Sequence, residues 1–247
     1  MKDNFSDKEY WKNRHSNKDN IKAVGVKGVS VKGNYYIYKF LQEQYEVLLS
    51  KIDISKVKTF FDCGFGDGYF LRFYKEKYPH IEISGIDISP EAKKRIDFVS
   101  SQNLLVGDLV SMDIRKTYDV VQSFDVLYHI LNDSDYYDAL YNMTKITKKY
   151  LVLHERFGTK AELMSSKHLR MRRSEFTNQI LNSENFYLYR EIPSHFLSMR
   201  LFTYRLNSYI GGLLYKTDDF IAKNLHDSTQ ERLASHFIRL YRRKSTL

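Results

Sequence analysis

Two apolar runs separated by a glycine-rich turn and a helical segment constrain the fold of this chain most strongly. Residues 59–68 read TFFDCGFGDG, so the first run ends at Asp62 and glycine follows at positions 64, 66 and 68. The second run, IEISGID, ends at Asp87. A strand, a glycine turn, a helix and a strand that ends in an acid are typical of an open α/β sheet that binds an adenosine. Glycine suits the turn because its backbone can approach a ligand closely, and Asp87 would accept the ribose hydroxyls.

The glycine spacing indicates which adenosine ligand to expect. The dinucleotide fingerprint is G-x-G-x-x-G, whereas this turn is one residue shorter and follows Asp62. A carboxylate at that position would repel a pyrophosphate but could bind an ammonium. S-adenosylmethionine has no phosphate, and its methionine end carries an ammonium. The segment resembles motif I, D-x-G-x-G-x-G, of class I S-adenosylmethionine-dependent methyltransferases, which implies S-adenosylmethionine as the cofactor.

The resemblance covers residues 59 to about 157 and implies further cofactor contacts. Asp87 matches the ribose-binding acid of the family, and residues 106–109, VGDL, resemble its adenine-binding turn. Residues 118–123, YDVVQS, resemble the fourth strand, whose end faces the methionine part of the cofactor. The expected cofactor-binding residues are Asp62, Gly64, Gly66, Gly68, Asp87, Ile88, Asp108, Leu109 and Ser123.

Strand and helix patterns alternate along most of the chain. Strands are predicted at 59–63, 81–87, 104–106, 118–123 and 150–155, with helices at 37–48 and 69–77 and from residues 89 and 134 onward. A further helix is predicted at about 161–181, then strands at 186–192 and 236–241. The alternation predicts a parallel sheet with right-handed crossovers. With the resemblance, the expected fold class is α/β: a Rossmann-like, doubly wound, seven-stranded sheet whose last strand is antiparallel.

Two segments lie outside this alternation. Residues 1–50 are expected to form an N-terminal arm and helix, and residues 51–247 the methyltransferase domain. The arm is either a disordered tail or a cover over the cofactor, with Tyr10, Trp11 or Tyr35 as the shield. A helical insertion at 195–233 is expected before the last strand, as a lid or as a homodimer surface.

Composition excludes several classes of protein. The 247 residues are 43% hydrophobic, which is enough for a sizeable core. The single cysteine rules out an internal disulfide, and no apolar run approaches the roughly 18 residues of a membrane span. We therefore expect a cytoplasmic protein with no membrane partner. His154-Glu155 begins like a zinc motif, but Gly158 stands where the second histidine would be, so no metal is expected.

The residues that follow the fourth predicted strand are the first candidates for chemistry. His129 is the expected general base, since the pKa of an unperturbed histidine lies near neutral pH. Its segment, DVLYHI, resembles a subset of small-molecule methyltransferases with D-V-L-x-H-I at this place. His129 could equally pack against the next helix. Asp125 and Tyr128 are expected substrate contacts, although Asp125 could instead orient His129 or cap a helix.

A second group of candidates follows the fifth strand. Glu155 is the second expected catalytic residue, because a carboxylate at the end of a buried strand is costly unless it has a function or a partner. The resembled subset also carries a His-x-x-x-Arg pair that His168 and Arg172 match. They are therefore expected substrate contacts, and the arginine suits a phosphate or carboxylate. A solvated helix face is the alternative.

The sequence favours a methyltransferase that acts on a hydroxyl or amine of a small, anionic or phosphorylated metabolite, with a sugar or glycan precursor as the leading candidate. The net charge of +9 also fits an RNA methyltransferase. The chain has, however, no separate basic RNA-binding domain and no Asn-Pro-Pro-Tyr-like motif. A non-catalytic, cofactor-binding subunit is the third alternative.

Overall fold

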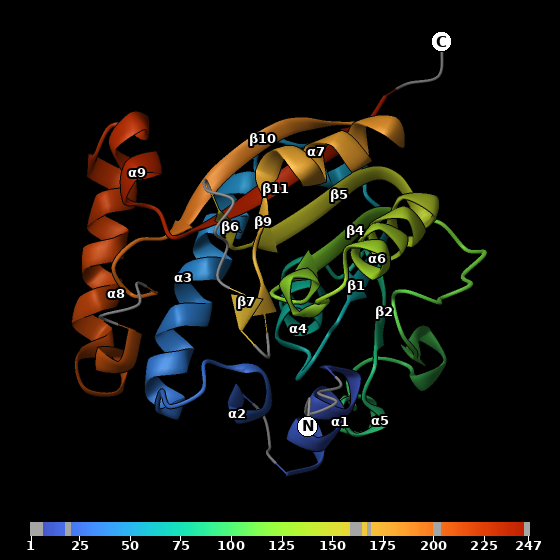
Figure 1. The fold of residues 1–247 in the computed structure, drawn as a ribbon, viewed down its shortest axis with the longest axis horizontal. Coiled ribbons are helices and arrows are strands. Elements are labelled where there is room, and N and C mark those ends of the chain that lie inside the picture. Colours follow the sequence, from blue (N-terminus) through green and yellow to red (C-terminus); the bar gives the residue numbers. More distant parts are fainter. Residues whose placement is uncertain (1–6, 18–20, 159–164, 167–168, 200–203, 245–247) are drawn as a thin grey trace.

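A seven-stranded sheet forms the centre of the protein (Figure 1). The structure is a computed structural model that describes residues 7–17, 21–158, 165–166, 169–199 and 204–244. The strand order is β10-β11-β5-β4-β1-β2-β3. The bounds are β1 (Thr59–Cys63), β2 (Glu82–Asp87), β3 (Leu104–Val106), β4 (Tyr118–Phe124), β5 (Thr147–Glu155), β10 (Phe186–His195) and β11 (His236–Arg243). β1 to β5 pair in parallel, and β11 runs antiparallel to both β5 and β10, which confirms the predicted fold class.

Helices cover both faces of the sheet because its central strands are apolar on both sides. Adjacent residues of a strand point to opposite faces, so Phe60 packs among side chains of α3 (Val31–Leu49) and α4 (Tyr69–Lys77). Its neighbour Phe61 packs on the other face, with α6 (Asp133–Ile146) and α7 (Ser174–Ser183). The remaining described helices are α1 (Asp7–Asn17), α2 (Ile21–Val24), α5 (Pro90–Lys94), α8 (Asn207–Asn224) and α9 (Asp227–Leu233). The doubly wound arrangement therefore follows from near-continuous apolar strands.

Local sequence signals account for most element bounds. β1, β3 and α4 have the predicted bounds, and the other sheet strands differ from theirs by a few residues at one end. Ser89 caps α5 by accepting a hydrogen bond from the Ala92 N–H, and Pro90 occupies the first helical position. α3 belongs to the predicted N-terminal unit, yet its apolar side packs into the same core as β1. Within the described residues, no helix has the length and hydrophobicity needed to cross a bilayer.

The helix predicted at 161–181 is confirmed from Ser174 onward and is wrong for the described residues before it. α7 begins only at Ser174, and the described residues before it form short strands. β6 (Phe157–Gly158) pairs with β9 (Arg172–Arg173), and β7 (Ser165–Ser166) pairs with β8 (Leu169–Arg170). The buried Arg172 side chain reaches the start of α6 from this extended segment. These tertiary contacts outweigh the local helical pattern.

The insertion docks against α3 at the side of the sheet (Figure 1). The Tyr215 hydroxyl of α8 donates to the Glu43 carboxylate of α3 at 2.8 Å. Asp218 of α8 is fully buried and accepts hydrogen bonds from the backbone N–H groups of Leu197 and Ser198 and from the Ser198 hydroxyl. α8 is therefore fastened both to α3 and to the chain that leaves β10.

Substitution of Asp218 should destabilise this connection. Asp218→Ala leaves several buried N–H and O–H donors without an acceptor, so we expect a loss of about 3 kcal/mol in the free energy of unfolding. Asp219→Ala is the matched control, because Asp219 is paired with Lys223 on the same helix at the surface. It should cost less than about 0.5 kcal/mol. Urea denaturation measures both, and equal losses would contradict the assigned role of Asp218.

Candidate functional site

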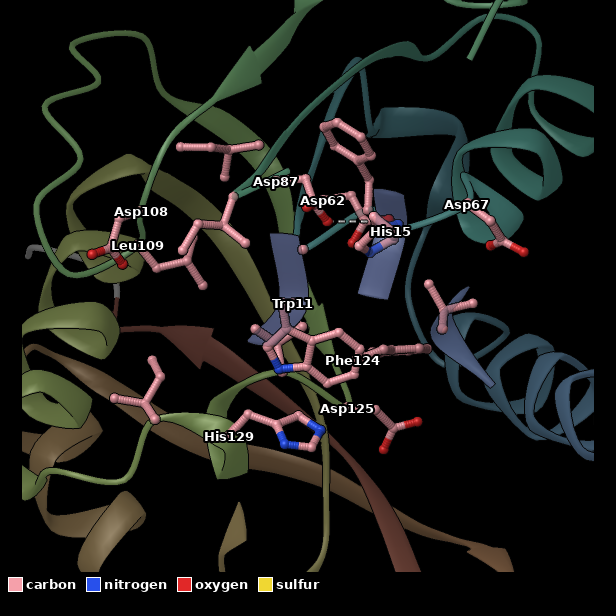
Figure 2. Close-up of a pocket in the computed structure, with 18 of the residues that line it drawn as sticks. Trp11, His15, Asp62, Asp67, Asp87, Asp108, Leu109, Phe124, Asp125 and His129 are labelled. Atoms are coloured by element: carbon pink, nitrogen blue, oxygen red, sulfur yellow. Dashed lines mark hydrogen bonds between the residues drawn. The ribbon is translucent and has the colours of Figure 1, made fainter. Parts of the chain in front are cut away.

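A cavity of about 150 Å³ opens where the carboxyl ends of β1, β2 and β4 meet. Figure 2 shows the side chains that surround it. The walls come from the glycine turn after β1, from the ends of β2 and β4, from the turn after β3 and from the N-terminal helices. A parallel α/β sheet binds its ligands at this edge, where the strand order reverses between β1 and β4.

The turn after β1 is shaped by glycine backbone angles. Gly64, Gly66 and Gly68 have φ of 87°, 56° and 80°, a region that disfavours residues with a Cβ. A Cβ on Gly64 would also lie 2.4 Å from Val126 Cγ2. Gly68 does not line the cavity; its left-handed backbone precedes the first residue of α4. The turn can therefore present its backbone to a ligand, which a side chain at Gly64 or Gly66 would obstruct.

Asp87 links the end of β2 to this turn. Its Oδ2 accepts a hydrogen bond from Gly66 N–H at 2.9 Å, and its Oδ1 accepts one from Ser89 N–H at 2.9 Å. Burial raises the pKa of Asp87 to about 6, although these backbone N–H groups oppose the shift. The carboxylate thus holds the glycine turn and keeps lone pairs for hydroxyl donors from the cavity.

A second buried carboxyl lies beside it. Asp62 is 3% exposed, and its Oδ1 accepts a hydrogen bond from Gln122 Nε2 at 3.1 Å. Burial raises the pKa of Asp62 to about 7, and the negative charge of Asp87 adds to that shift while the Gln122 bond opposes it. A cationic ligand group would supply a countercharge that these two acids lack. The acids and the glycine turn therefore fit S-adenosylmethionine.

The N-terminal helices lie against the cavity. Trp11 and His15 of α1 and Val24 of α2 line it, and the Trp11 ring contacts the His129 ring edge-on at a centroid distance of 4.7 Å. Lys8 of α1 pairs with Asp108 at 2.5 Å. The expected cover is thus formed by Trp11. Tyr35 is 51% exposed and does not line the cavity. No described residue of the insertion 195–233 lines it either.

The structure brings most of the predicted site residues together. The cavity walls include Asp62, Gly64, Gly66, Asp87, Ile88, Asp108, Leu109, Asp125 and His129. Ser123 is buried within β4 and does not line the cavity. Tyr128 does not line it either, but its hydroxyl donates a hydrogen bond to the wall residue Asp125, at 3.3 Å from Oδ1. His168 lies outside the described residues.

Glu155 and Arg172 are placed differently from the prediction. Glu155 does not line the cavity; its Oε1 accepts a hydrogen bond from Leu127 N–H at 3.1 Å, and burial raises its pKa well above the usual range. Arg172 donates to Asp133 Oδ1 at 2.8 Å and to the Ile130 carbonyl at 2.8 Å, and its guanidinium lies over the Tyr136 ring. Both side chains brace the segment between β4 and α6. Their partners come from distant parts of the chain, which spacing could not reveal.

Sequence reasoning missed several residues of the wall. Lys8, His15, Val24 and Tyr38 reach the cavity from the N-terminal region, from whose sequence only Tyr10, Trp11 and Tyr35 were predicted as candidate contacts. His154, at the end of β5, supports Asp125 from behind, with 3.1 Å between His154 Nδ1 and Asp125 Oδ1. The position of His154 at the end of a strand indicated a place near the site, but its neighbour Glu155 was predicted as the catalytic residue instead. In the described part of the chain, no group of three His, Cys, Asp or Glu side chains is arranged to hold a metal ion.

Comparisons with known proteins agree with this geometry. Residues 60–150 match a family model described as a methyltransferase domain. No curated protein matches the chain. Among solved structures, magnesium protoporphyrin IX methyltransferase from Synechocystis with bound S-adenosylmethionine is 14% identical, with a TM-score of 0.60 over 99% of this chain and 100% of that one.

Two further structures are similar at the level of the fold. The O-methyltransferase of a polyketide synthase multienzyme from Brevibacillus brevis is 14% identical, with a TM-score of 0.60 over 89% of this chain and 81% of that one. An N-methyltransferase from Bradyrhizobium japonicum is 13% identical, with a TM-score of 0.60 over 97% and 99% of the two chains. Both were crystallised with S-adenosylhomocysteine.

The raised pKa of Asp62 has a consequence for stability. An acid whose pKa is higher in the folded state favours folding at low pH, and this contribution is lost as pH rises from about 4 to about 7. At pH 8, Asp62→Asn should therefore stabilise the protein without cofactor by about 2 kcal/mol, or roughly 5 °C in Tm. At pH 4 the two proteins should melt alike. Calorimetry at both pH values checks this, and a lower Tm for the variant at pH 8 would refute it.

Proposed function

We propose that this chain, whose residues 60–150 match a methyltransferase domain model, is an S-adenosylmethionine-dependent methyltransferase that methylates a small molecule bound in the cavity beside α1. The observation that carries the proposal is the pair of hydrogen bonds by which Asp87 holds Gly66 and Ser89 at the cavity edge. The glycine turn, the buried Asp87 carboxylate and several apolar side chains therefore line the same cavity.

Some residues of the cavity would bind S-adenosylmethionine, and others would bind the methyl acceptor. Asp87 would accept the ribose hydroxyls, Ile88 and Leu109 would flank the adenine, and Asp62 would face the methionine ammonium. When bound, the cofactor supplies an electrophilic methyl group on a sulfonium sulfur. Figure 2 shows Asp125, His129 and Phe124 beside Trp11, across the indole from Asp62 and Asp87. We assign this end to the methyl acceptor.

The chain's own contribution would be alignment and exclusion of water. Trp11 and Val24 contribute apolar surface to the wall of the cavity, as do Tyr38, Phe70 and Phe124. A dry site keeps the acceptor and the methyl group aligned and prevents water from competing. If the acceptor is a hydroxyl, His129 is the wall residue suited to remove its proton.

The position of the cavity supports a small acceptor rather than RNA. The net charge of the chain is +9, yet Lys8 is the one lysine or arginine among the described residues that line the cavity, and it is paired with Asp108. The anionic acceptor expected from Arg172 also loses its main support, because Arg172 bonds Asp133 and two backbone carbonyls. A sugar without phosphate remains compatible with the cavity.

Radiolabelled methyl transfer tests the proposed function. Protein incubated with methyl-labelled S-adenosylmethionine and a deproteinised, low-molecular-weight cell extract should label a small product that mass analysis can identify. Bulk RNA is the comparison substrate and should remain unlabelled. Labelled RNA without a small product would support the RNA alternative, whereas cofactor binding with no transfer to any fraction would support a non-catalytic subunit.

Asp87→Ala should weaken cofactor binding. The substitution removes the acceptor for ribose hydroxyls and for Gly66 N–H, so we expect the affinity for S-adenosylhomocysteine to fall by at least about tenfold. Glu91→Gln is the control, since Glu91 lies at the surface of α5 in a pair with Lys94. Its affinity should match that of the unchanged protein. Thermal shift titration gives both values, and an unaltered affinity for Asp87→Ala would contradict the ribose assignment.

A further inference from the structure

Asp125 stands in an unusual backbone conformation at the acceptor end of the cavity. It is the first residue after β4 and has φ of 58°, which non-glycine residues rarely adopt. Its N–H donates to the His154 carbonyl at 3.0 Å, so the main chain of β5 fixes the turn. Strained backbone of this kind is often retained at functional sites.

A buried relay holds the Asp125 carboxylate. His154 Nδ1 lies 3.1 Å from Asp125 Oδ1, and His154 Nε2 lies 2.8 Å from the Ser194 hydroxyl of β10. The Ser194 hydroxyl can donate or accept in its contact with the imidazole. Both His154 and Ser194 are at most 1% exposed. The buried side of the Asp125 carboxylate is therefore lined by His154, with Ser194 behind it.

Asp125 differs from the other acids at this edge of the sheet in its access to the cavity. Asp62 and Asp87 are buried, whereas the Asp125 side chain is 31% exposed. Burial alone would raise the pKa of Asp125, but the adjacent His154 and the more distant His195 and His129 lower it below the usual range. Asp125 thus presents a carboxylate to the cavity and is a poor proton acceptor.

The whole cavity is acidic although the chain is basic. Among the described residues, its wall contains six aspartates, and Lys8 is its one lysine or arginine. His15 adds no charge at neutral pH, because burial and the nearby Arg95 and Arg14 lower its pKa to about 4. The six acids are Asp62, Asp67, Asp87, Asp108, Asp125 and Asp135. An anionic acceptor would be repelled here, and a positively charged or hydrogen-bond-donating one would be attracted.

Aromatic side chains line the same cavity as this carboxylate. Trp11 packs edge-on against His129, and the Tyr38 ring lies 5.1 Å from Tyr69 and 6.5 Å from Phe70. Phe70 contacts Phe124, the residue directly before Asp125, at 4.6 Å. A carboxylate among aromatic faces is an environment that stabilises an organic cation.

From this geometry we propose that the methyl acceptor is an amine bound against Asp125, and that His154 is a positioning residue for that carboxylate. The inference rests on the proposed function. An amine that arrives protonated first loses a proton to solvent, and its freed nitrogen lone pair then forms the N–CH₃ bond while the S–CH₃ bond breaks and leaves its electron pair on sulfur. Positive charge then moves from sulfur to nitrogen, where the Asp125 carboxylate stabilises it.

The first experiment identifies the acceptor. A deproteinised low-molecular-weight cell extract is divided into fractions retained by a cation exchanger and by an anion exchanger, and part of each is treated with acetic anhydride to cap its amines. The label should enter the cation-exchanger fraction and fall at least tenfold after capping. Label that enters only the anion-exchanger fraction, or that is unchanged by capping, overturns the amine assignment while leaving methyl transfer itself established. No transfer to any fraction would instead count against the proposed function.

The second experiment tests Asp125. Asp125→Asn should lower kcat/KM for the labelled amine by about a hundredfold, while the affinity for S-adenosylhomocysteine stays within threefold. Asp138→Asn, on the exposed side of α6, is the matched control and should behave like the unchanged protein. A variant with kcat/KM within threefold of normal, or an equal loss of cofactor affinity, would overturn the role of Asp125 in acceptor binding.

The role of His154 is tested by comparing a conservative substitution with an apolar one. The asparagine side chain places an N–H near the position of Nδ1, so His154→Asn should keep most of the activity that His154→Leu loses, at comparable Tm. Equal activities for the two variants would overturn the positioning role. If neither folds, Ser194→Ala, which leaves the His154–Asp125 contact in place, should lower kcat/KM by about threefold to tenfold; no change would refute the relay.

Discussion

The parallel pairing of β1 with β2 is the arrangement on which the site depends. It sets the glycine turn after β1 beside Asp87 at the end of β2, where one carboxylate holds two segments through Gly66 N–H and Ser89 N–H. The turn needs glycine because its backbone lies in the left-handed region and because Val126 and Val24 leave no space for a Cβ at Gly64 and Gly66. Pairing, turn and acid therefore act as one structural unit.

Charge is distributed unevenly between the surface and the interior of this protein. The chain as a whole carries +9, yet six aspartates and a single lysine are the acidic and basic side chains that line the described wall of the cavity, apart from its histidines. Burial raises the pKa of Asp62 and Asp87. The ionised form of each acid therefore costs the folded protein stability, whereas a bound cationic ligand would stabilise that form. Such a cost is expected where stability is exchanged for binding.

The sequence predicted the regular part of the fold well. The strand at 59–63, the turn that follows it and Asp87 are local patterns that a short stretch of sequence specifies, and the structure reproduces them. Residues that depend on tertiary contact were harder to place. Glu155 and Arg172 brace the segment before α6 rather than the cavity, and Trp11 reaches His129 from more than a hundred residues away. The partner of each of these side chains is set by packing, which periodicity does not encode.

The central claim is that the edge of the sheet around Asp87 binds a sulfonium nucleoside. Isothermal titration calorimetry of the full chain with S-adenosylhomocysteine, and separately with NADH and ATP, measures this directly. The account predicts one site per chain for S-adenosylhomocysteine and no measurable heat with the two phosphorylated nucleotides, which Asp62 would repel. Heat from NADH or ATP, or none from S-adenosylhomocysteine in several buffers, would contradict it.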